Sequence, residues 1–320
     1  MIAHWDEVEG RSRRMGHLGG TWRALAGAAG SVGVGLSRIE VPAGLWSTPA
    51  HVHGRQEEIF FVLGGSGLSW QDGETYEIGA GDRLVHRVNG RAHTLQAGPD
   101  GLDVLAFGTR IWDEAPTLTR ADSVWLGQAW IVLAGEDDHP WAREVAAGPP
   151  ELSDAPSERP GSIVHVDDER VPVSERDGET VARTRRALSA AAGSQLTGLQ
   201  HVSVPPGKLN AAPHCHSAEE ELFAVLDGEG ELELTPGPSR RSHGAEDERH
   251  PVRRGDVIAR PPGSGVAHTF RAGAGGLTLL AYGTREPTDV CYYPRSNKIF
   301  WRGVGVIGRI EHLDYWDGED

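Results

Sequence analysis

The chain has 320 residues, which suits two domains of ordinary size, each able to bury its own hydrophobic core. Its formal net charge is −15, from 31 Lys and Arg against 46 Asp and Glu, and this sign argues against nucleic acid or an anionic membrane as a general partner. With only Cys215 and Cys291 as cysteines, a reducing compartment is the simpler interpretation. The N-terminus lacks an apolar run behind a basic segment, so we expect a soluble cytoplasmic protein without a membrane span.

Short segments separated by glycine and proline predict an all-β protein. Residues 22–29 allow either a short helix or a strand, and residues 31–41 partly alternate between apolar and polar side chains, which predicts a strand. Asp72-Gly73 is a hairpin signal. Further segments of the first half have the composition of strands: 59–63, 68–71, 84–88 and 102–107.

Residues 111–160 are predicted to connect the two halves of the chain. Their tryptophans indicate that the first part of the connector packs on a folded domain, and the Pro-, Glu- and Ser-rich stretch at 148–160 is typical of a linker. These tryptophans are Trp112, Trp125, Trp130 and Trp141.

The second half starts near Ser162, and its segment 197–204 repeats the strand at 31–41. Its last part, residues 286–320, is rich in aromatic side chains. We expect this tail to pack across the other domain or a partner subunit, with only the final acidic residues loose.

The second half carries a cluster of residues that can bind a metal ion: His214, His216, Glu221 and His268. His214 and His216 are one residue apart, so on a β-strand their side chains lie on the same side. Three imidazoles and one carboxylate form a plausible ligand set for a divalent first-row metal, and they leave coordination positions for water or substrate.

The first half carries the same set: His51, His53, Glu58 and His93. His51 precedes its counterpart by 163 residues, as does Glu58, whereas His93 precedes its counterpart by 175. The additional twelve residues fall in a polar stretch at 236–250. Since chance is a poor explanation for the recurring spacing, we predict a metal site in each half. A repeat of this length indicates two whole domains, because solenoid repeats are shorter.

At these residues the chain resembles the cupin superfamily, and specifically a bicupin. The first cupin motif is His-x-His, a Glu after three or four residues and a glycine six residues later; the second is a glycine, a Pro-x-Gly turn and a His. The second half fits both through Gly228, Gly255 and Pro261-Pro262-Gly263. The first half fits through Gly65 and Gly81, with Arg87-Val88-Asn89-Gly90 in place of the Pro-x-Gly turn.

The resemblance implies an all-β fold of two tandem cupin barrels, each a double-stranded β-helix or jelly roll, joined by a short connector. The expected boundaries are 1–110 for the N-terminal cupin domain, 111–160 for the connector and 161–320 for the C-terminal cupin domain. It also implies up to two divalent transition metal ions per chain, and Fe, Mn, Ni, Co and Zn all suit a set of three His and one Glu.

The glutamates next to the predicted ligands have a separate interpretation. Adjacent residues of a strand face opposite sides, so Glu58 and Glu221 are the predicted ligands, whereas Glu57, Glu219 and Glu220 are predicted to be surface charges. Because the motif allows three or four residues between His and Glu, Glu57 remains an alternative ligand to Glu58.

For activity, the resemblance implies a metal-dependent oxidoreductase of the dioxygenase type, similar to the quercetinase bicupins, that acts on a small organic substrate. Oxalate decarboxylase-type bicupins place an arginine shortly before the His pair, where this chain has Thr48 and Ala211. The alternatives are a metal-dependent isomerase or decarboxylase, or a non-enzymatic protein that binds metal and a small ligand. The expected partner is a small molecule, and a homo-oligomer is compatible with the sequence.

Overall fold

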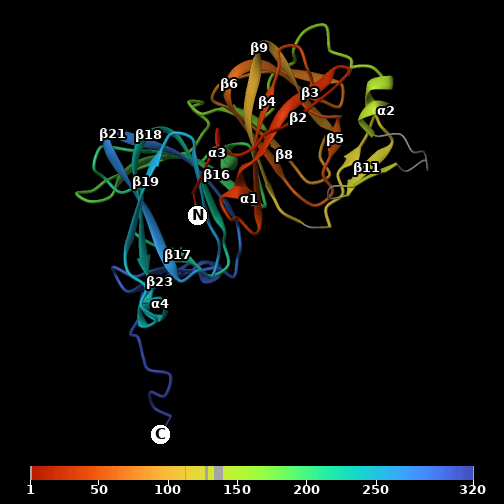
Figure 1. The fold of residues 1–320 in the computed structure, drawn as a ribbon. Coiled ribbons are helices and arrows are strands. Elements are labelled where there is room, and N and C mark those ends of the chain that lie inside the picture. The colour runs from red at the N-terminus through yellow and green to blue at the C-terminus, as the bar shows by residue number, and fades with distance from the viewer. Residues whose placement is uncertain (1, 112, 127–128, 133–139, 320) are drawn as a thin grey trace.

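The computed structural model describes residues 2–111, 113–126, 129–132 and 140–319, and most of its regular structure is β-strand (Figure 1). Among the described residues, one sheet of twelve strands forms most of the first half and one of eight strands forms most of the second. Both sheets curl into barrels. The all-β, jelly-roll prediction is therefore confirmed.

The strands of the first sheet run through the described part of the first half and include one strand from the second. They are β2 (Arg11–Met15), β3 (Leu18–Ala24), β4 (Val34–Val41), β5 (His51–Val52), β6 (Glu58–Gln71), β7 (Glu74–Gly79), β8 (Asp82–His86), β9 (His93–Thr109), β10 (Thr117–Leu118), β11 (Ser123–Leu126), β12 (Ala129–Val132) and β13 (Ile163–His165). The open choice at residues 22–29 resolves into the end of β3 followed by helix α1 (Leu25–Ala28).

The second sheet is the counterpart of the first and includes one strand from the N-terminus. Its strands are β1 (Ile2–His4), β14 (Val173–Asp177), β15 (Ala182–Arg186), β16 (Thr197–Val204), β18 (Glu221–Pro236), β19 (Glu248–Arg253), β20 (Asp256–Arg260) and β21 (Val266–Thr284). A third sheet holds β17 (Cys215–His216), β22 (Val290–Tyr293), β23 (Lys298–Trp301) and β24 (Val306–Arg309). The remaining helices are α2 (Pro140–Ala146), α3 (Leu188–Ala191), α4 (Pro238–Ser242) and the 3₁₀ turn η1 (Arg302–Val304).

Each barrel is built on one long antiparallel strand pair, β6 with β9 and β18 with β21. Both pairs contain register shifts, which bend the strands and increase their twist. The motif glycines lie at these shifts: Gly65 has φ +75° and Gly228 has φ +80°, a region that favours glycine. A Cβ atom on Gly65 would lie 2.1 Å from the carbonyl oxygen of Gly101, so a side chain there would push the strands apart.

The two halves exchange one strand each. β1, at the start of the chain, pairs with β20 in the second sheet, with Ile2 opposite Ile258. β13 follows the connector and pairs with β8 in the first sheet, with Ile163 opposite Leu84. The boundaries expected at residues 110 and 160 do not anticipate this reciprocal exchange, which ties each sheet to the other half of the chain.

A shared hydrophobic core lies between the barrels. Each barrel has its own interior cluster, around Phe60 in the first and around Phe223 and Phe270 in the second. A third cluster contains residues from both halves, and within it the rings of Phe107 and Tyr282 lie 5.1 Å apart. Burying a large apolar side chain stabilises a fold by about 1.5–3 kcal/mol. The outward faces of several strands therefore stabilise the pairing of the halves.

Two buried carboxylates connect the halves, at positions where the sequence predicts surface charges. Glu220 accepts hydrogen bonds from the backbone N–H groups at residues 32–34 in the first half. Its counterpart Glu57 accepts them from the N–H groups of Gln195 and Leu196, at 2.7 and 2.9 Å, and from Ser194 Oγ. Glu57 and Glu220 are 1 % and 2 % exposed, and Glu219 is also buried, so the surface-charge prediction is wrong.

The connector and the aromatic tail contain counterparts of each other. β10, β11 and β12 extend the first sheet from β5, and β22, β23 and β24 extend in the same manner from β17. Of the two alternatives for the tail, packing across the other domain is therefore wrong for residues 290–309, and packing on a partner subunit stays a prediction. Farther on, the chain leads away from the body of the molecule (Figure 1), and Tyr315 and Trp316 are exposed.

The connector tryptophans lie partly within the described residues. Trp141 is buried in a cluster with Trp46 and Trp70, as expected for a connector that packs on a barrel. Trp112 lies outside the described residues, and the side chains of Trp125 and Trp130 are likewise not described.

Replacing Glu220 with Ala should lower the free energy of unfolding by about 2–4 kcal/mol, because buried N–H groups lose a charged acceptor. Urea denaturation measures this change. The exposed Glu229 of β18, the strand that follows Glu220, is a matched control, and its replacement with Ala should change stability by less than about 0.5 kcal/mol. Equal midpoints for the two variants would contradict the proposed link between the halves.

Candidate metal centres

The structure brings together all four predicted residues of the first half. One donor atom from each of His51, His53, Glu58 and His93 lies within 4.8 Å of the others. Glu58 Oε2 is 3.5 Å from His51 Nε2, 3.6 Å from His53 Nε2 and 2.9 Å from His93 Nε2. Glu58 starts β6 and His93 starts β9, so they lie at opposite ends of this strand pair, and the bend of the pair brings them together. His51 in β5 lies directly opposite His93. We call this cluster the N-terminal centre.

The four counterparts in the second half form the C-terminal centre. Donors from His214, Glu221 and His268 lie within 4.8 Å of one another. His216 joins through Glu221, since its Nε2 lies 3.3 Å from Glu221 Oε2. The same oxygen lies 3.7 Å from His214 Nε2 and 3.0 Å from His268 Nε2. One carboxylate oxygen thus faces three imidazole nitrogens, as in the first half.

Hydrogen bonds at the far side of the rings orient the imidazoles. His51 Nδ1 donates to the carbonyl of Pro49 at 3.0 Å, and its counterpart His214 donates to that of Ala212 at 2.8 Å. These bonds assign the proton to Nδ1 and leave the Nε2 lone pair facing the glutamate. The donor atoms that meet at each centre are therefore those that a metal ion needs.

An acidic residue beyond each His pair supports this orientation, and the sequence prediction missed both. Asp289 Oδ2 accepts a hydrogen bond from His216 Nδ1 at 2.7 Å, and Glu114 Oε1 lies 3.4 Å from His53 Nδ1. Glu114 and Asp289 are 175 residues apart, which is the same offset as His93 and His268. That offset is the signal that could have found them. Carboxylates in this position increase the basicity of metal-bound imidazoles.

The acid–base properties of both centres favour positive charge between the glutamate and the imidazoles. Burial opposes ionisation of Glu58, but contacts with His51, His53 and His93 outweigh it and hold its pKa well below the ordinary value. Burial also disfavours the His216 imidazolium, yet Asp289 and Glu221 raise its pKa to about 10. A divalent cation supplies the charge that these groups attract, and it competes with the proton.

Several donor atoms of the C-terminal centre lack hydrogen bonds although they are buried. They are Nε2 of His216, Nε2 of His268 and Oε2 of Glu221, and His53 Nε2 of the N-terminal centre shares this property. Buried polar atoms in folded proteins are normally satisfied. These donor atoms lie close together without hydrogen bonds between them, and a cation bound by all of them would account for this arrangement. The residues present therefore fit a divalent metal ion.

Two further residues lie near the predicted ligands. Glu57 bonds to the second half, as described above, and does not belong to the N-terminal centre. The Cys291 sulfur lies within 4.8 Å of donors from His214 and His216. Burial raises the pKa of its thiol to about 12, whereas coordination to a metal ion favours the thiolate. Cys291 is therefore a further candidate ligand that the sequence prediction did not include. Cys215 and Cys291 do not form a disulfide.

The two centres differ at one position of the adjacent strand. His86 lies directly opposite Glu58 in the pairing of β6 and β8, and Arg260 lies directly opposite Glu221 in the pairing of β18 and β20. His86 stacks on His93 with ring centroids 3.6 Å apart, and burial followed by the influence of His93 holds its pKa well below the ordinary value. The sequence prediction did not single out either residue, because neither belongs to the motifs.

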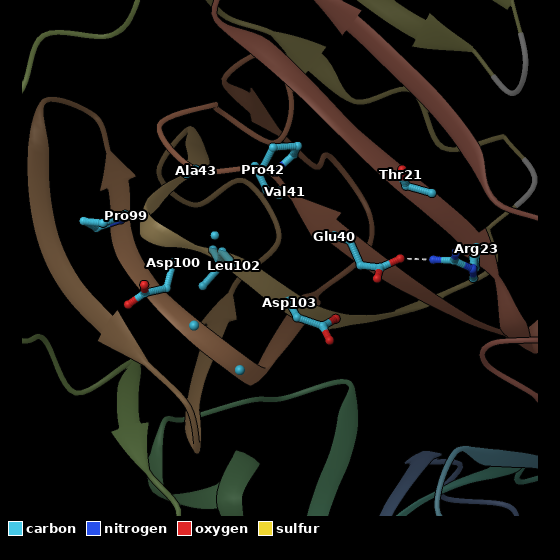
Figure 2. A pocket seen from close by; sticks show the side chains of 13 residues that line it. Thr21, Arg23, Glu40, Val41, Pro42, Ala43, Pro99, Asp100, Leu102 and Asp103 are labelled. Carbon is cyan, nitrogen blue, oxygen red and sulfur yellow. Dashed lines mark hydrogen bonds and ion pairs between the residues drawn. The ribbon is translucent and has the colours of Figure 1, made fainter.

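One surface cleft lies away from both centres. It encloses about 720 Å³ and is lined by turns around Pro42, Gly65 and Pro99, with Arg23 and Glu40 joined across it (Figure 2). A second cleft of about 340 Å³ is lined by Trp5, Arg38 and Arg254 between the halves. Neither cleft is lined by a predicted ligand of the two centres, so the size of a cleft does not indicate where the metal centres lie.

The comparisons with known proteins agree with the geometry. The family model described as "Cupin domain" matches residues 37–98 and 200–280, once in each half. No curated protein sequence matches the chain. No helix of the described residues is long and apolar enough to cross a membrane.

Solved structures similar to this chain share its fold at low identity. Oxalate decarboxylase from Lactobacillus farciminis, in complex with formate, is 17 % identical with a TM-score of 0.57, and the match covers 89 % of this chain and 86 % of that chain. Oxalate decarboxylase from Bacillus subtilis, described with Mn(II) centres, is 13 % identical with a TM-score of 0.57, covering 91 % and 78 %. Vicilin from hazelnut, Corylus avellana, is 14 % identical with a TM-score of 0.57, covering 91 % and 87 %.

Replacing Asp289 with Asn should weaken metal binding at the C-terminal centre by about 10- to 100-fold, because the imidazole loses its charged acceptor. Replacing Glu114 with Gln should affect only the N-terminal centre. Titration of the metal-free variants with Mn²⁺, followed by electron paramagnetic resonance, distinguishes the two classes of site. Unchanged affinity in the Asp289 variant would show that this carboxylate has no part in holding the metal.

Replacing His216 with Ala should remove most metal from the C-terminal centre, because one of four donors is lost. Replacing His53 with Ala should halve the metal content if the centres bind independently. Elemental analysis of protein purified without a His tag gives both values. Complete loss of metal in the His53 variant would instead mean that the two centres fold together.

Proposed function

We propose that this chain, a bicupin of the cupin superfamily, is a divalent-metal enzyme that decarboxylates a small organic acid. The observation that carries this proposal is the convergence of three imidazole nitrogens on one buried carboxylate oxygen in each barrel. Such a set leaves open coordination positions, as a catalytic metal site requires.

The metal ion, when bound, would act as a Lewis acid that orients an oxygen-donating substrate and stabilises developing negative charge. His51, His53, Glu58 and His93 would hold one ion, and His214, His216, Glu221 and His268 the other. The surrounding protein keeps the rings in position through Asp289, Glu114 and backbone carbonyls. Burial of each centre excludes bulk water, which strengthens electrostatic interactions with the substrate.

Decarboxylation suits this arrangement and is consistent with the similar structures. The reaction breaks the carbon–carbon bond to the departing carboxylate, releases CO₂ and leaves an electron pair on the remaining carbon, which then takes up a proton. The oxalate decarboxylases among the similar structures support this reaction class through the shared fold. The absence of an arginine shortly before the His pairs, at Thr48 and Ala211, means that substrate recognition must use other residues.

A dioxygenase is the second candidate, and the ligand set favours it independently of the similar structures. Three His and one Glu also suit Fe(II) or Mn(II) with positions left for both a substrate and O₂. This reaction consumes one O₂ per substrate, whereas decarboxylation has no net oxygen requirement. Oxygen balance therefore separates the two reactions.

The test uses protein loaded with Mn²⁺ or Fe²⁺ and a panel of small carboxylic, keto and enolic acids. We expect release of one CO₂ per substrate consumed, equally in air and under argon. Stoichiometric O₂ uptake would instead establish the dioxygenase. Metal-loaded protein that binds members of the panel but converts none would overturn the proposal of an enzyme. The double variant His53→Ala, His216→Ala serves as the metal-depleted control.

A further inference from the structure

We propose that the C-terminal centre is the substrate site and that Arg260 there binds the carboxylate of a small organic anion, held between this guanidinium and the metal. This inference rests on the proposed metal enzyme and specifies its substrate class and its active half. Its physical basis is a partly buried arginine directly opposite the ligand glutamate, at the position where the first half has His86.

Arg260 is directed into the second barrel beside the ligand glutamate. It is the last residue of β20, and in that strand Val257 and Ala259 face the core shared by the two halves, whereas Ile258 faces the barrel interior. Because side chains alternate along a strand, Arg260 lies on the same side as Ile258. Its direct partner in the strand pairing is Glu221, whose carboxylate belongs to the centre.

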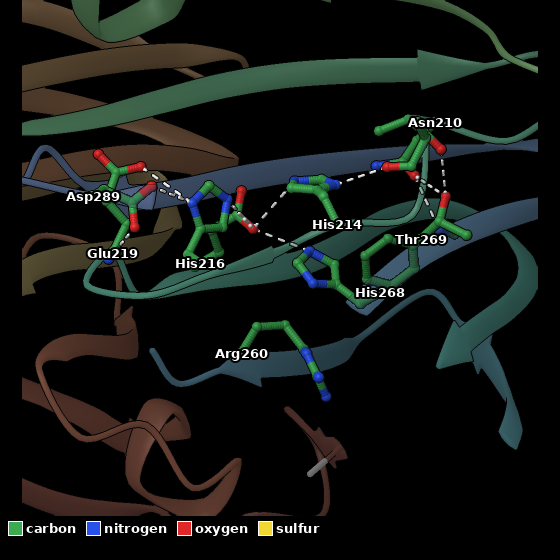
Figure 3. Close-up of polar contacts among 12 residues, drawn as sticks. Asn210, His214, His216, Glu219, Arg260, His268, Thr269 and Asp289 are labelled. Carbon is green, nitrogen blue, oxygen red and sulfur yellow. Dashed lines mark hydrogen bonds and ion pairs between the residues drawn. The ribbon is translucent and has the colours of Figure 1, made fainter. Parts of the chain in front are cut away.

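The guanidinium of Arg260 is only partly used by the protein. Its Nη2 donates to the carbonyl of Val266 at 2.8 Å. Its Nε is buried and has no hydrogen-bond partner among the described residues. Figure 3 draws Arg260 without a polar contact to the other residues shown. An unpaired buried donor on a cation is costly to a protein unless something satisfies it, and an anionic ligand would do so.

Electrostatics agree with this placement. Burial lowers the pKa of Arg260, and the nearby Glu221 and Cys215 partly oppose this effect, with a further contribution from Glu248. Arg260 in turn contributes to the lowered pKa of His268, whose main cause is burial. The charge of Arg260 therefore interacts with two predicted ligands, Glu221 and His268.

A second arginine, Arg183 of β15, interacts electrostatically with the same centre. Its Nη1 donates to the carbonyl of Asn210 at 3.0 Å. Burial lowers its pKa, as do Arg185 and Arg176, whereas Tyr293 and Glu221 oppose this. The ring of Tyr293 stacks on that of His214, with centroids 5.8 Å apart.

The N-terminal centre has neither arginine. The residue equivalent to Arg260, 174 positions upstream, is His86, and that equivalent to Arg183, 163 positions upstream, is Gly20. With a divalent cation bound, Glu58 and the nearby Glu114 balance its charge. At the C-terminal centre Glu221 and Asp289 do the same, and the arginines leave a surplus of positive charge. The Glu219 carboxylate there is already paired with Arg302.

These features select a particular class of ligand. A small organic anion can place one oxygen on the metal ion and a carboxylate on the guanidinium, whose N–H donors match carboxylate geometry. A neutral diketone or phenol can accept only a weaker hydrogen bond from Arg260, because it lacks the negative charge of a carboxylate. The C-terminal centre should therefore prefer anions over neutral molecules of equal shape.

The experiment measures binding of malonate and of the neutral malonamide to Co²⁺-loaded protein through the visible spectrum of the metal. We expect malonate to bind and malonamide not to bind at equal concentration. Replacing Arg260 with Gln should weaken malonate binding by roughly 10- to 100-fold while the Co²⁺ content stays the same. The matched variant His86→Gln should leave malonate binding unchanged.

Each outcome has a defined meaning. If Arg260→Gln retains Co²⁺ and binds malonate like the wild type, the inference is wrong although the metal enzyme stands. If His86→Gln weakens malonate binding and Arg260→Gln does not, the substrate site lies in the first half. Protein that takes up no metal refutes the proposed function instead. Should Arg260→Gln fail to fold, as judged by thermal unfolding, Arg260→Lys replaces it, and wild-type malonate affinity with this point charge would count against bidentate recognition.

Discussion

Both centres depend on a long antiparallel strand pair that bends at register shifts. Glu58 starts β6 and His93 starts β9, and in an unbent pair these residues would lie at opposite ends of a ladder of about fourteen residues. The register shifts near Gly65 and Gly228 fold each pair over, so that both ends face one barrel interior. The short strands with the His pairs then complete each donor set. The metal-binding geometry is thus a consequence of strand curvature.

The two halves stabilise each other through groups that lie next to the ligands in the sequence. Glu57 and Glu220 each precede a ligand glutamate, and strand alternation turns them outward, where they cap backbone N–H groups of the other half. The exchanged strands β1 and β13 and the shared apolar core have the same effect. Because the outer strand faces are covered, displacement of one half would disturb the strand that carries the ligand glutamate of the other.

Similarity between the halves makes their differences informative. The donors, the Nδ1 acceptors and the carboxylates behind the His pairs recur in both. The residue opposite the ligand glutamate does not recur, since it is His86 in one half and Arg260 in the other. A guanidinium beside the ligand glutamate is not needed to hold a metal ion and would weaken binding of another cation. Its presence at this position in only one of the two centres is therefore best understood through an anion that binds there.

The sequence by itself determined the two-fold repeat, the all-β class and the two donor sets, because strand alternation and motif spacing are local properties. It could not determine where Glu57 and Glu220 point, because isolated acidic residues on strands are usually solvated and their N–H partners lie more than 130 residues away. It left open whether the aromatic tail packs on the other domain or on a partner subunit, and pairing of β22 with β17 holds the tail beside its own barrel. The exchange of β1 and β13, the carboxylates Glu114 and Asp289, and the position of Arg260 opposite Glu221 depend on strand register. Only the tertiary structure decided these, because register is set by packing and turn geometry across the whole barrel.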